Sequence, residues 1–264
     1  MHRPPWERRP WRIDITVGLV LAALFVAVVA AARPERPAVS LQATATSTSV
    51  PAPTTSSTRA IPTPAPRDVP TRPHGESVSR ISTTDPVVFL TIDDGLVRDP
   101  EVVAKIRQAR VPVSLFLVES EARAGTGYFA ELVAAGATVQ SHTRSHADLR
   151  TLSAGAQADE ICGSTALYRQ LFGAAPVLFR PPFGFYDATT RQAAAGCGFS
   201  TMVLWNATMN DGVLRIQGDR EHLLPGDIIL MHFRPDLSEN LSVVFARLAA
   251  DGLGVGRLED YLAR

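Results

Sequence analysis

Short apolar runs alternate with amphipathic stretches along residues 80–264. The apolar runs have the length of buried strands and are rich in β-branched residues, and they fall at residues 87–92, 113–118, 137–139, 177–179, 201–205 and 227–231. Helical spacing of apolar positions occurs at residues 100–110, 128–135, within 152–172, at 188–195 and at 240–250. This alternation of strands and helices predicts an α/β fold, either a parallel sheet covered by helices or a (β/α) barrel.

An uncharged run at residues 15–32 follows a segment that contains four arginines, Arg3, Arg8, Arg9 and Arg12. As a helix the run spans ~27 Å, close to the hydrocarbon thickness of a bilayer. The preceding arginines place residues 1–14 in the cytoplasm by the positive-inside bias. We therefore expect a single transmembrane signal-anchor and a domain that lies outside the cytoplasm. The alternative is a cleaved signal peptide, because residues 30–32 resemble a cleavage site, and the remainder is exported in that case too.

Residues 33–79 form the predicted linker. Proline, threonine and serine fill 24 of these 47 positions, and large apolar residues are scarce. Such a segment buries too little apolar surface to offset its ordering entropy, so we expect a disordered tether. The globular domain is then predicted over residues 80–264, which are enough for one core.

The charge is distributed unevenly although the whole chain is neutral. Residues 1–79 carry nine arginines and five acidic residues, whereas residues 80–264 carry 17 basic and 21 acidic residues. A mildly acidic domain argues against nucleic acid as a partner. The two cysteines are too few for a disulfide scaffold or a zinc ribbon.

Ionisable residues recur directly after the predicted strands. They are Asp93, Asp94, His142, His146, Arg180, Asp211 and His232. Because the carboxyl ends of parallel strands meet at one rim of an α/β fold, this recurrence predicts an active site at that rim.

Two of these residues, His142 and His146, have the i, i+4 spacing that places both rings on one face of a helical turn. A carboxylate from residues 93–94 would complete a two-histidine, one-aspartate metal site with open coordination positions, as in catalytic centres. The alternative is a pair of solvated loop histidines.

Four motifs together resemble the NodB-type polysaccharide deacetylases, the family-four carbohydrate esterases. The motifs are Thr91-Ile92-Asp93-Asp94-Gly95, the His142/His146 pair, Phe179-Arg180-Pro181-Pro182-Phe183-Gly184 and Leu230-Met231-His232. Each is weak alone, but their order and spacing match over about residues 84–262. The resemblance implies an irregular (β/α) barrel with fewer units than a full eight.

The resemblance also implies roles. Asp94, His142 and His146 are similar to the ligands of a divalent metal ion, usually Zn²⁺. Asp93 resembles the general base that activates the attacking water, and Arg180 the residue that orients this base.

On the opposite side of the reaction, His232 resembles the general acid that protonates the leaving amine. Leu230 resembles the apolar wall for the acetyl methyl group. Phe183 stands where a tyrosine is common, and its backbone amide is expected to stabilise the oxyanion. Trp205, which begins the fourth family motif, is expected to contact substrate.

That fourth motif departs from the family pattern Trp-x-x-Asp-x-x-Asp-Trp. Thr208 occupies the first acidic position and Gly212 the final aromatic one. The carboxylate that would tune His232 is therefore either missing or supplied by Asp211. The alternative for Asp211-Gly212 is an ordinary turn.

The sequence thus predicts a membrane-tethered deacetylase outside the cytoplasm that removes N-acetyl groups from a cell-wall or exopolysaccharide aminosugar. The alternatives are an O-acetyl esterase with the same site and a glycan-binding domain that has lost catalysis. Cys162 and Cys197 lie on or just after predicted helices in an oxidising compartment, so we predict a disulfide between them; the alternative is two separate buried thiols.

Overall fold

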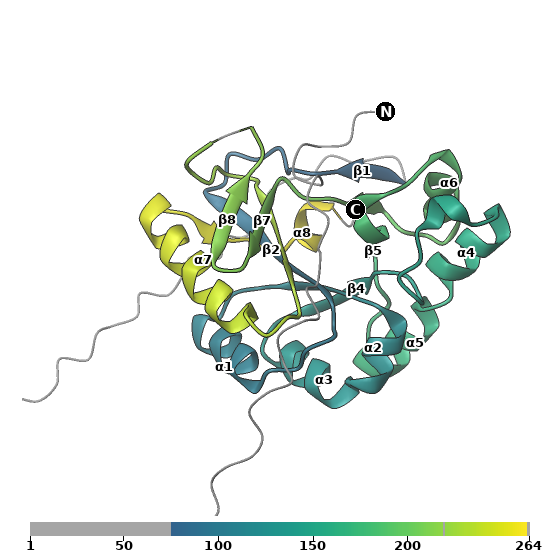
Figure 1. The fold of residues 1–264 in the computed structure, drawn as a ribbon, viewed down its shortest axis with the longest axis horizontal. Helices are drawn as coiled ribbons and strands as arrows, with labels where there is room; N and C mark the ends of the chain where they lie inside the picture. Colours follow the sequence, from purple (N-terminus) through teal and green to yellow (C-terminus); the bar gives the residue numbers. More distant parts are fainter. Residues whose placement is uncertain (1–74, 219, 263–264) are drawn as a thin grey trace, which may run out of the picture. The chain divides into compact units, whose positions relative to one another are not determined.

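The computed structural model describes residues 75–218 and 220–262 (Figure 1). The predicted basic segment 1–14, the predicted anchor 15–32 and nearly all of the predicted linker 33–79 lie outside the described residues. Within the described ranges, no helix combines the length and the apolar character that a membrane crossing requires. The anchor therefore stays a prediction from sequence.

A curled sheet of ten strands forms the centre of the described part of the chain (Figure 1). Its strands are β1 (Glu76–Val78), β2 (Val87–Asp94), β3 (Ser114–Leu117), β4 (Thr138–Ser141), β5 (Leu178–Phe179), β6 (Thr201–Val203), β7 (Ala207–Asn210), β8 (Val213–Ile216), β9 (Ile228–His232) and β10 (Gly254–Val255). The order is β1-β6-β5-β4-β3-β2-β9-β7-β8, and β10 pairs with β2. All pairs of these strands are parallel except the β7–β8 hairpin. The α/β class is therefore confirmed.

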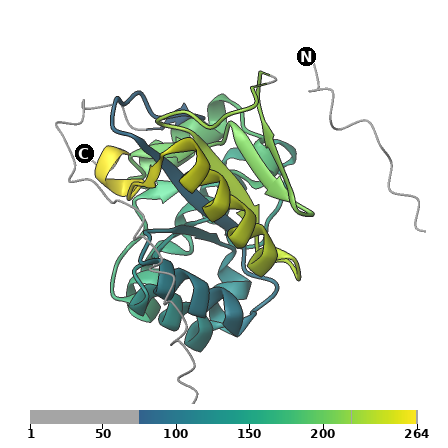
Figure 2. The same ribbon diagram turned by 90° about the vertical axis from the view of Figure 1, so that its left-hand side faces the viewer.

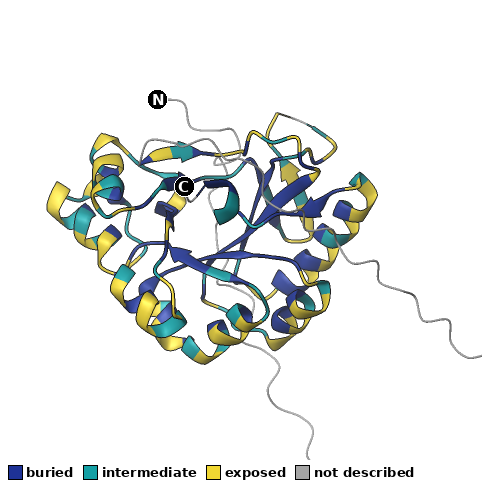
Figure 3. Cartoon of the chain, turned by 180° about the vertical axis from the view of Figure 1, so that it is seen from behind, coloured by how far each residue is buried: buried dark blue, intermediate teal, exposed yellow. Residues whose placement is uncertain are grey.

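Apart from the short C-terminal one, the helices of the described residues cover the outside of this sheet, and exposed residues lie on their outward faces (Figures 2 and 3). The C-terminal helix packs with Phe89 and Phe116 on the opposite, inner face of the sheet. The helices are α1 (Pro100–Ala109), α2 (Glu119–Ala124), α3 (Thr126–Ala134), α4 (Ala154–Cys162), α5 (Thr165–Phe172), α6 (Ala188–Gly196), α7 (Leu237–Asp251) and α8 (Glu259–Leu262), with short 3₁₀ turns at Leu149–Thr151 and Pro182–Gly184. Helix α1 packs against α3 and α7, and α4 packs against α6. The apolar side of each amphipathic helix thus faces the sheet.

Strand β2 lies between β3 and β9 and positions the chemistry of the chain. Its residues are buried as far as Asp93, as expected for a parallel strand that is covered on both faces. The strand is longer than predicted and includes both aspartates. Its register sets Asp93 beside Phe116 on one side and beside His232 on the other.

The sheet is an irregular, open barrel, because β1 and β8 are edge strands of the described sheet. One isolated bridge, from Arg80 after β1 to Asp227 before β9, connects the two sides. Strand β1 lies in residues that the sequence assigned to the linker. It belongs to the domain because its backbone pairs with β6 and Val78 is buried.

Two further elements differ from the sequence prediction. The helix expected within 152–172 is two helices, α4 and α5, separated at Gly163 and Ser164. A disulfide joins Cys162, the last residue of α4, to Cys197, which caps the C-terminus of α6. The predicted disulfide between these cysteines is therefore confirmed.

Candidate active site

Predicted site residues come together where the parallel strands end. Asp93 and Asp94 close β2, His142 follows β4, Arg180 follows β5 and His232 closes β9. These strands run parallel in one sheet, with only β3 between β4 and β2, so their carboxyl ends share one rim. The rim that the sequence predicted is present.

Arg180 is fully buried and holds Asp93. Its Nη1 donates to Asp93 Oδ1 at 2.6 Å and to Thr91 Oγ1 at 2.9 Å, while Nε donates to the carbonyl oxygen of Val203. Burial raises the pKa of Asp93 to about 6, although the charges of Arg180 and His232 oppose that rise. The carboxylate is therefore fixed in direction and basic enough to accept a proton near neutral pH.

Asp94, His142 and His146 form a compact set of metal-ligand donors. Asp94 Oδ1 lies 3.6 Å from His142 Nε2 and 3.4 Å from His146 Nε2, and the donor atoms of all three lie within 4.8 Å of one another. Two ligands about 2.1 Å from a tetrahedral zinc ion lie about 3.4 Å apart. The spacing therefore suits one divalent cation.

The protonation of His142 supports this fit. Its Nδ1 lies 2.7 Å from the carbonyl oxygen of Arg180, which only accepts, so Nδ1 carries the proton and Nε2 presents a lone pair. Burial holds the pKa of His142 far below its usual range, so the ring is neutral. A lone pair that faces the carboxylate of Asp94 is unfavourable unless a cation lies between them.

The two histidines do not share a helical turn, contrary to the sequence prediction. Residues 142–148 form an irregular loop after β4. Thr143 and His146 both have left-handed backbones, with φ of 69° and 62°, and His146 N–H donates to Thr143 Oγ1 at 3.0 Å. The loop brings the rings together by these turns, with centroids 4.9 Å apart. Left-handed conformations of non-glycine residues cost about 1–3 kcal/mol each and persist only where surrounding contacts hold them.

His232 faces an amide rather than a carboxylate. Its Nδ1 lies 3.4 Å from Oδ1 of Asn210, at the end of β7. Burial lowers the pKa of His232, and the charge of Asp93 opposes that shift. Leu230, two residues earlier on β9, is buried and shares the face of His232.

The altered fourth motif folds as a hairpin. Thr208 pairs with Leu230, two residues before His232 on β9. Asp211 and Gly212 form the turn between β7 and β8, both with positive φ, and the Asp211 N–H donates to Asp236 Oδ2. The turn interpretation of Asp211-Gly212 is thus the one that the structure adopts.

Phe183 lies within the 3₁₀ turn Pro182–Gly184, and Trp205 packs against that turn. Phe183 has a left-handed backbone, with φ of 60°, and its exposed ring lies 4.7 Å from the ring of His146. Trp205 is partly buried beneath Gly184, where an added Cβ would come within 3.0 Å of the indole. Phe183 therefore borders the donor set, whereas Trp205 supports the turn from below.

Sequence reasoning missed three residues that act on the site. Thr91 accepts from Arg180, Asn210 faces His232, and Glu160 binds the loop between the two histidines. Thr91 belongs to the motif Thr91-Ile92-Asp93-Asp94-Gly95. Because it lies two residues before Asp93 on a strand, both side chains point to the same face, and this spacing could have indicated its role. The other two depend on strand register and on helix packing, for which the sequence offered no local signal.

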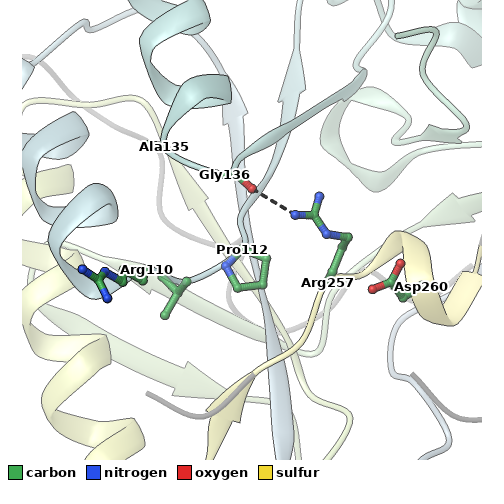
Figure 4. A pocket seen from close by; sticks show the side chains of 7 residues that line it. Arg110, Pro112, Ala135, Gly136, Arg257 and Asp260 are labelled. Carbon is green, nitrogen blue, oxygen red and sulfur yellow. Dashed lines mark hydrogen bonds between the residues drawn. The ribbon is translucent and has the colours of Figure 1, made fainter. Parts of the chain in front are cut away.

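A pocket of ≈ 330 Å³ lies away from this rim (Figure 4). It is lined by Arg110, Val111, Pro112, Ala135, Gly136, Arg257 and Asp260. These residues include the segments just before β3 and β4, so the pocket is at the opposite ends of the strands. None of the predicted site residues lines it.

Comparison with known proteins shows which proteins the chain resembles. The family model for polysaccharide deacetylases matches residues 80–202. An uncharacterised protein of Streptomyces coelicolor is 45% identical over 190 residues, which are 70% of this chain and 76% of that protein. A chitooligosaccharide deacetylase of Sinorhizobium fredii is 29% identical over 164 residues, which are 59% of this chain and 76% of that protein. One similar solved structure is the family-four carbohydrate esterase of Streptomyces lividans in complex with acetate. Its TM-score is 0.59 at 25% identity, and the match covers 67% of this chain and 95% of the esterase.

Proposed function

Because this chain belongs to the polysaccharide deacetylase family, we propose that it is a metal-dependent hydrolase that removes N-acetyl groups from an aminosugar polymer outside the cytoplasm. The chain is an enzyme that acts on non-peptide carbon–nitrogen bonds. The observation that carries the proposal is the compact donor set of Asp94, His142 and His146 beside a separately held carboxylate, Asp93. One group would bind the cation while the other stays available for proton transfer.

The donor set suits a hard or borderline divalent ion, and we propose Zn²⁺. Two imidazoles and one carboxylate leave open coordination positions, which a catalytic site requires. A cation bound there would lower the pKa of water and polarise the acetyl carbonyl.

Asp93 is the proposed general base. Arg180 fixes the direction of its carboxylate by the 2.6 Å hydrogen bond, and the free oxygen, Oδ2, lies 3.7 Å from His142 Nε2. This oxygen therefore faces the donor set, where it can take a proton from the attacking water.

His232 is the proposed general acid. It stands beside Asp93 in the register of β2 and β9, so the proposed base and acid occupy adjacent strand ends. The imidazolium would donate its proton to the leaving amine as the carbon–nitrogen bond breaks.

Two further residues are proposed to bind the acetyl group. Leu230 is buried on the face of His232 and offers an apolar surface to the methyl. Phe183 borders His146 with a left-handed backbone, and we propose that its N–H stabilises the oxyanion. Trp205 supports the turn that carries Phe183, so its effect on substrate would be indirect.

The cellular location is proposed from the N-terminal sequence. The arginines before residues 15–32 and the proline-rich segment after them favour a single-pass membrane anchor with a tethered domain outside the cytoplasm. Protease added to intact cells should then release an active domain by cutting the linker. A domain that stays protected, with tags that report the cytoplasm, would refute this location and the wall substrate with it.

Acetate release tests the function. The Zn²⁺-loaded protein is incubated in turn with peptidoglycan, N-acetyl-chitooligosaccharides and acetylxylan, with Asp93→Asn as the inactive control. We expect acetate from at least one N-acetylated substrate. Acetate from acetylxylan alone would indicate an O-acetyl esterase. No acetate from any of the three would indicate a glycan-binding domain without catalysis.

A further inference from the structure

The loop that carries His146 is held by two glutamates from outside the family motifs. Glu160 on α4 accepts three hydrogen bonds from this loop. Its Oε2 takes the N–H groups of Arg144 and Ser145 at 3.1 and 2.9 Å, and its Oε1 takes Ser145 Oγ at 2.8 Å. A carboxylate that binds successive backbone donors fixes the loop more strongly than a neutral acceptor would.

Glu119, the first residue of α2, holds the other side of the same loop. Its N–H donates to the carbonyl oxygen of Thr143 at 3.1 Å, and its buried carboxylate accepts from Arg144 Nε at 3.2 Å. The Arg144 side chain also crosses Gly163, where an added Cβ would lie 2.3 Å from Cδ. Residues 143–145 are therefore hydrogen-bonded to α2 on one side and to the end of α4 on the other.

The disulfide fastens the same end of α4. Cys162 lies two residues after Glu160, and its partner Cys197 follows α6, which packs against α4. Helix α4 thus has a covalent connection to α6 beside the residue that binds the metal-ligand loop.

We propose that Glu160 is a positioning residue for the metal site and that the Cys162–Cys197 disulfide holds Glu160 in place. This inference rests on the metal site of the proposed function but not on its substrate. His142 extends from β4, and its ring bonds the Arg180 carbonyl, so it stays ordered without Glu160. His146 depends on the loop, whose left-handed residues need external contacts. Loss of Glu160 therefore removes one of the three ligands from its position.

Zinc affinity, measured by competition with a chromophoric chelator in the absence of substrate, tests the role of Glu160. We expect Glu160→Ala to weaken Zn²⁺ binding by at least about tenfold, the lower end of losses seen for residues that orient metal ligands. Glu160→Gln should recover most of the affinity, because an amide oxygen can accept the same two N–H groups. Asp159→Asn, a change at the exposed neighbouring acid on α4, is the matched control and should leave the affinity unchanged.

Native affinity in Glu160→Ala overturns the proposal, and so does an equal loss in Asp159→Asn. If Glu160→Ala does not fold, Ser145→Ala replaces it, since it removes only the contact to Oε1 and should weaken binding less than tenfold but measurably. Because no substrate is present, these outcomes are independent of whether the enzyme releases acetate.

A double-mutant cycle tests the disulfide. The paired change Cys162→Ser and Cys197→Ser should weaken Zn²⁺ binding in the otherwise native protein. It should cause no additional loss when combined with Glu160→Ala, because the disulfide acts through Glu160. Additive losses, or native affinity in the paired serine variant, would overturn the connection between the disulfide and the metal site.

Discussion

His232 Nδ1 lies 3.4 Å from the amide oxygen of Asn210, across the parallel pair of β7 and β9. The amide can orient the ring, but it carries no charge to stabilise the imidazolium. Burial already lowers the pKa of His232, and Asp93 is the carboxylate that opposes this most strongly. The proposed acid of this chain therefore holds its proton less tightly than one with a carboxylate at Nδ1.

Replacing this amide by a carboxylate should shift the pH dependence of the reaction. His232 acts while protonated, so activity falls as the pH rises through its pKa. Asn210→Asp favours the charged ring and should move the alkaline limb of the kcat profile upward by about one pH unit. Asp211→Asn changes only the hairpin turn and should leave the limb in place. An alkaline limb that does not move in Asn210→Asp would exclude Asn210 as the neighbour that sets this pKa.

The α/β fold and the rim that carries the site could be predicted because both depend on short, local sequence patterns. Apolar runs of strand length mark buried parallel strands, and ionisable residues directly after such runs must meet at one edge. Asp93, Asp94, Arg180 and His232 all lie where this reasoning placed them. Parallel strands of one sheet end at the same edge whatever their side chains are, so the position of these residues could be predicted without knowledge of side-chain packing.

The side chains that contact a site residue across two paired strands could not be predicted in this way, because they depend on the register of the strands. The sequence assigned the neighbour of His232 to position 208 or 211, whereas the pairing of Thr208 with Leu230 brings Asn210 to His232. The i, i+4 spacing of His142 and His146 suggested a helical turn, but left-handed residues and contacts from distant helices produce the same convergence. The i, i+4 spacing therefore indicated that the two histidines could lie together, but not which backbone conformation brings them together.

The metal site should be lost when either histidine ligand is removed. The purified protein is expected to hold about one divalent ion per chain, and His142→Ala and His146→Ala should each lose it, because one imidazole and one carboxylate are too few ligands. His222→Ala removes an exposed histidine elsewhere and should keep the ion. Elemental analysis of the four proteins measures this directly. Full metal content in both ligand variants would exclude the proposed site.

Substitutions of Asp93 and Asp94 should have different effects on metal content and on kcat. Asp93→Asn should keep the metal ion but lower kcat by about 10²- to 10⁴-fold, the usual contribution of a general base. Asp94→Asn should lower the metal content itself, because it changes a ligand. Metal analysis and single-turnover rates on the same preparations distinguish the two. If Asp93→Asn lost the ion while Asp94→Asn kept it, the assigned roles of the two carboxylates would be reversed.

The buried carboxyl of Asp93 should also give the metal-free protein a measurable dependence of stability on pH. Burial raises its pKa from 3.8 to about 6, so between these values the native state binds more protons than the unfolded state. By linkage, the contribution of Asp93 to the unfolding free energy falls as the pH rises through this window, and its full size is about 3 kcal/mol. Burial lowers the pKa values of His142 and His232, so their contributions to the unfolding free energy change with pH in the opposite sense, and Asp93 must be isolated by difference.

Asp93→Asn provides that difference, because asparagine stays neutral at every pH. The variant should match the wild type most closely near pH 4 and become progressively more stable than it toward pH 7, by at most about 3 kcal/mol. Denaturant unfolding of both metal-free proteins at several pH values measures the gap. Adding Zn²⁺ should shrink it, because a nearby cation favours the charged carboxylate of the wild type. A gap that stays constant from pH 4 to pH 7 would mean that Asp93 titrates alike in the folded and unfolded chains.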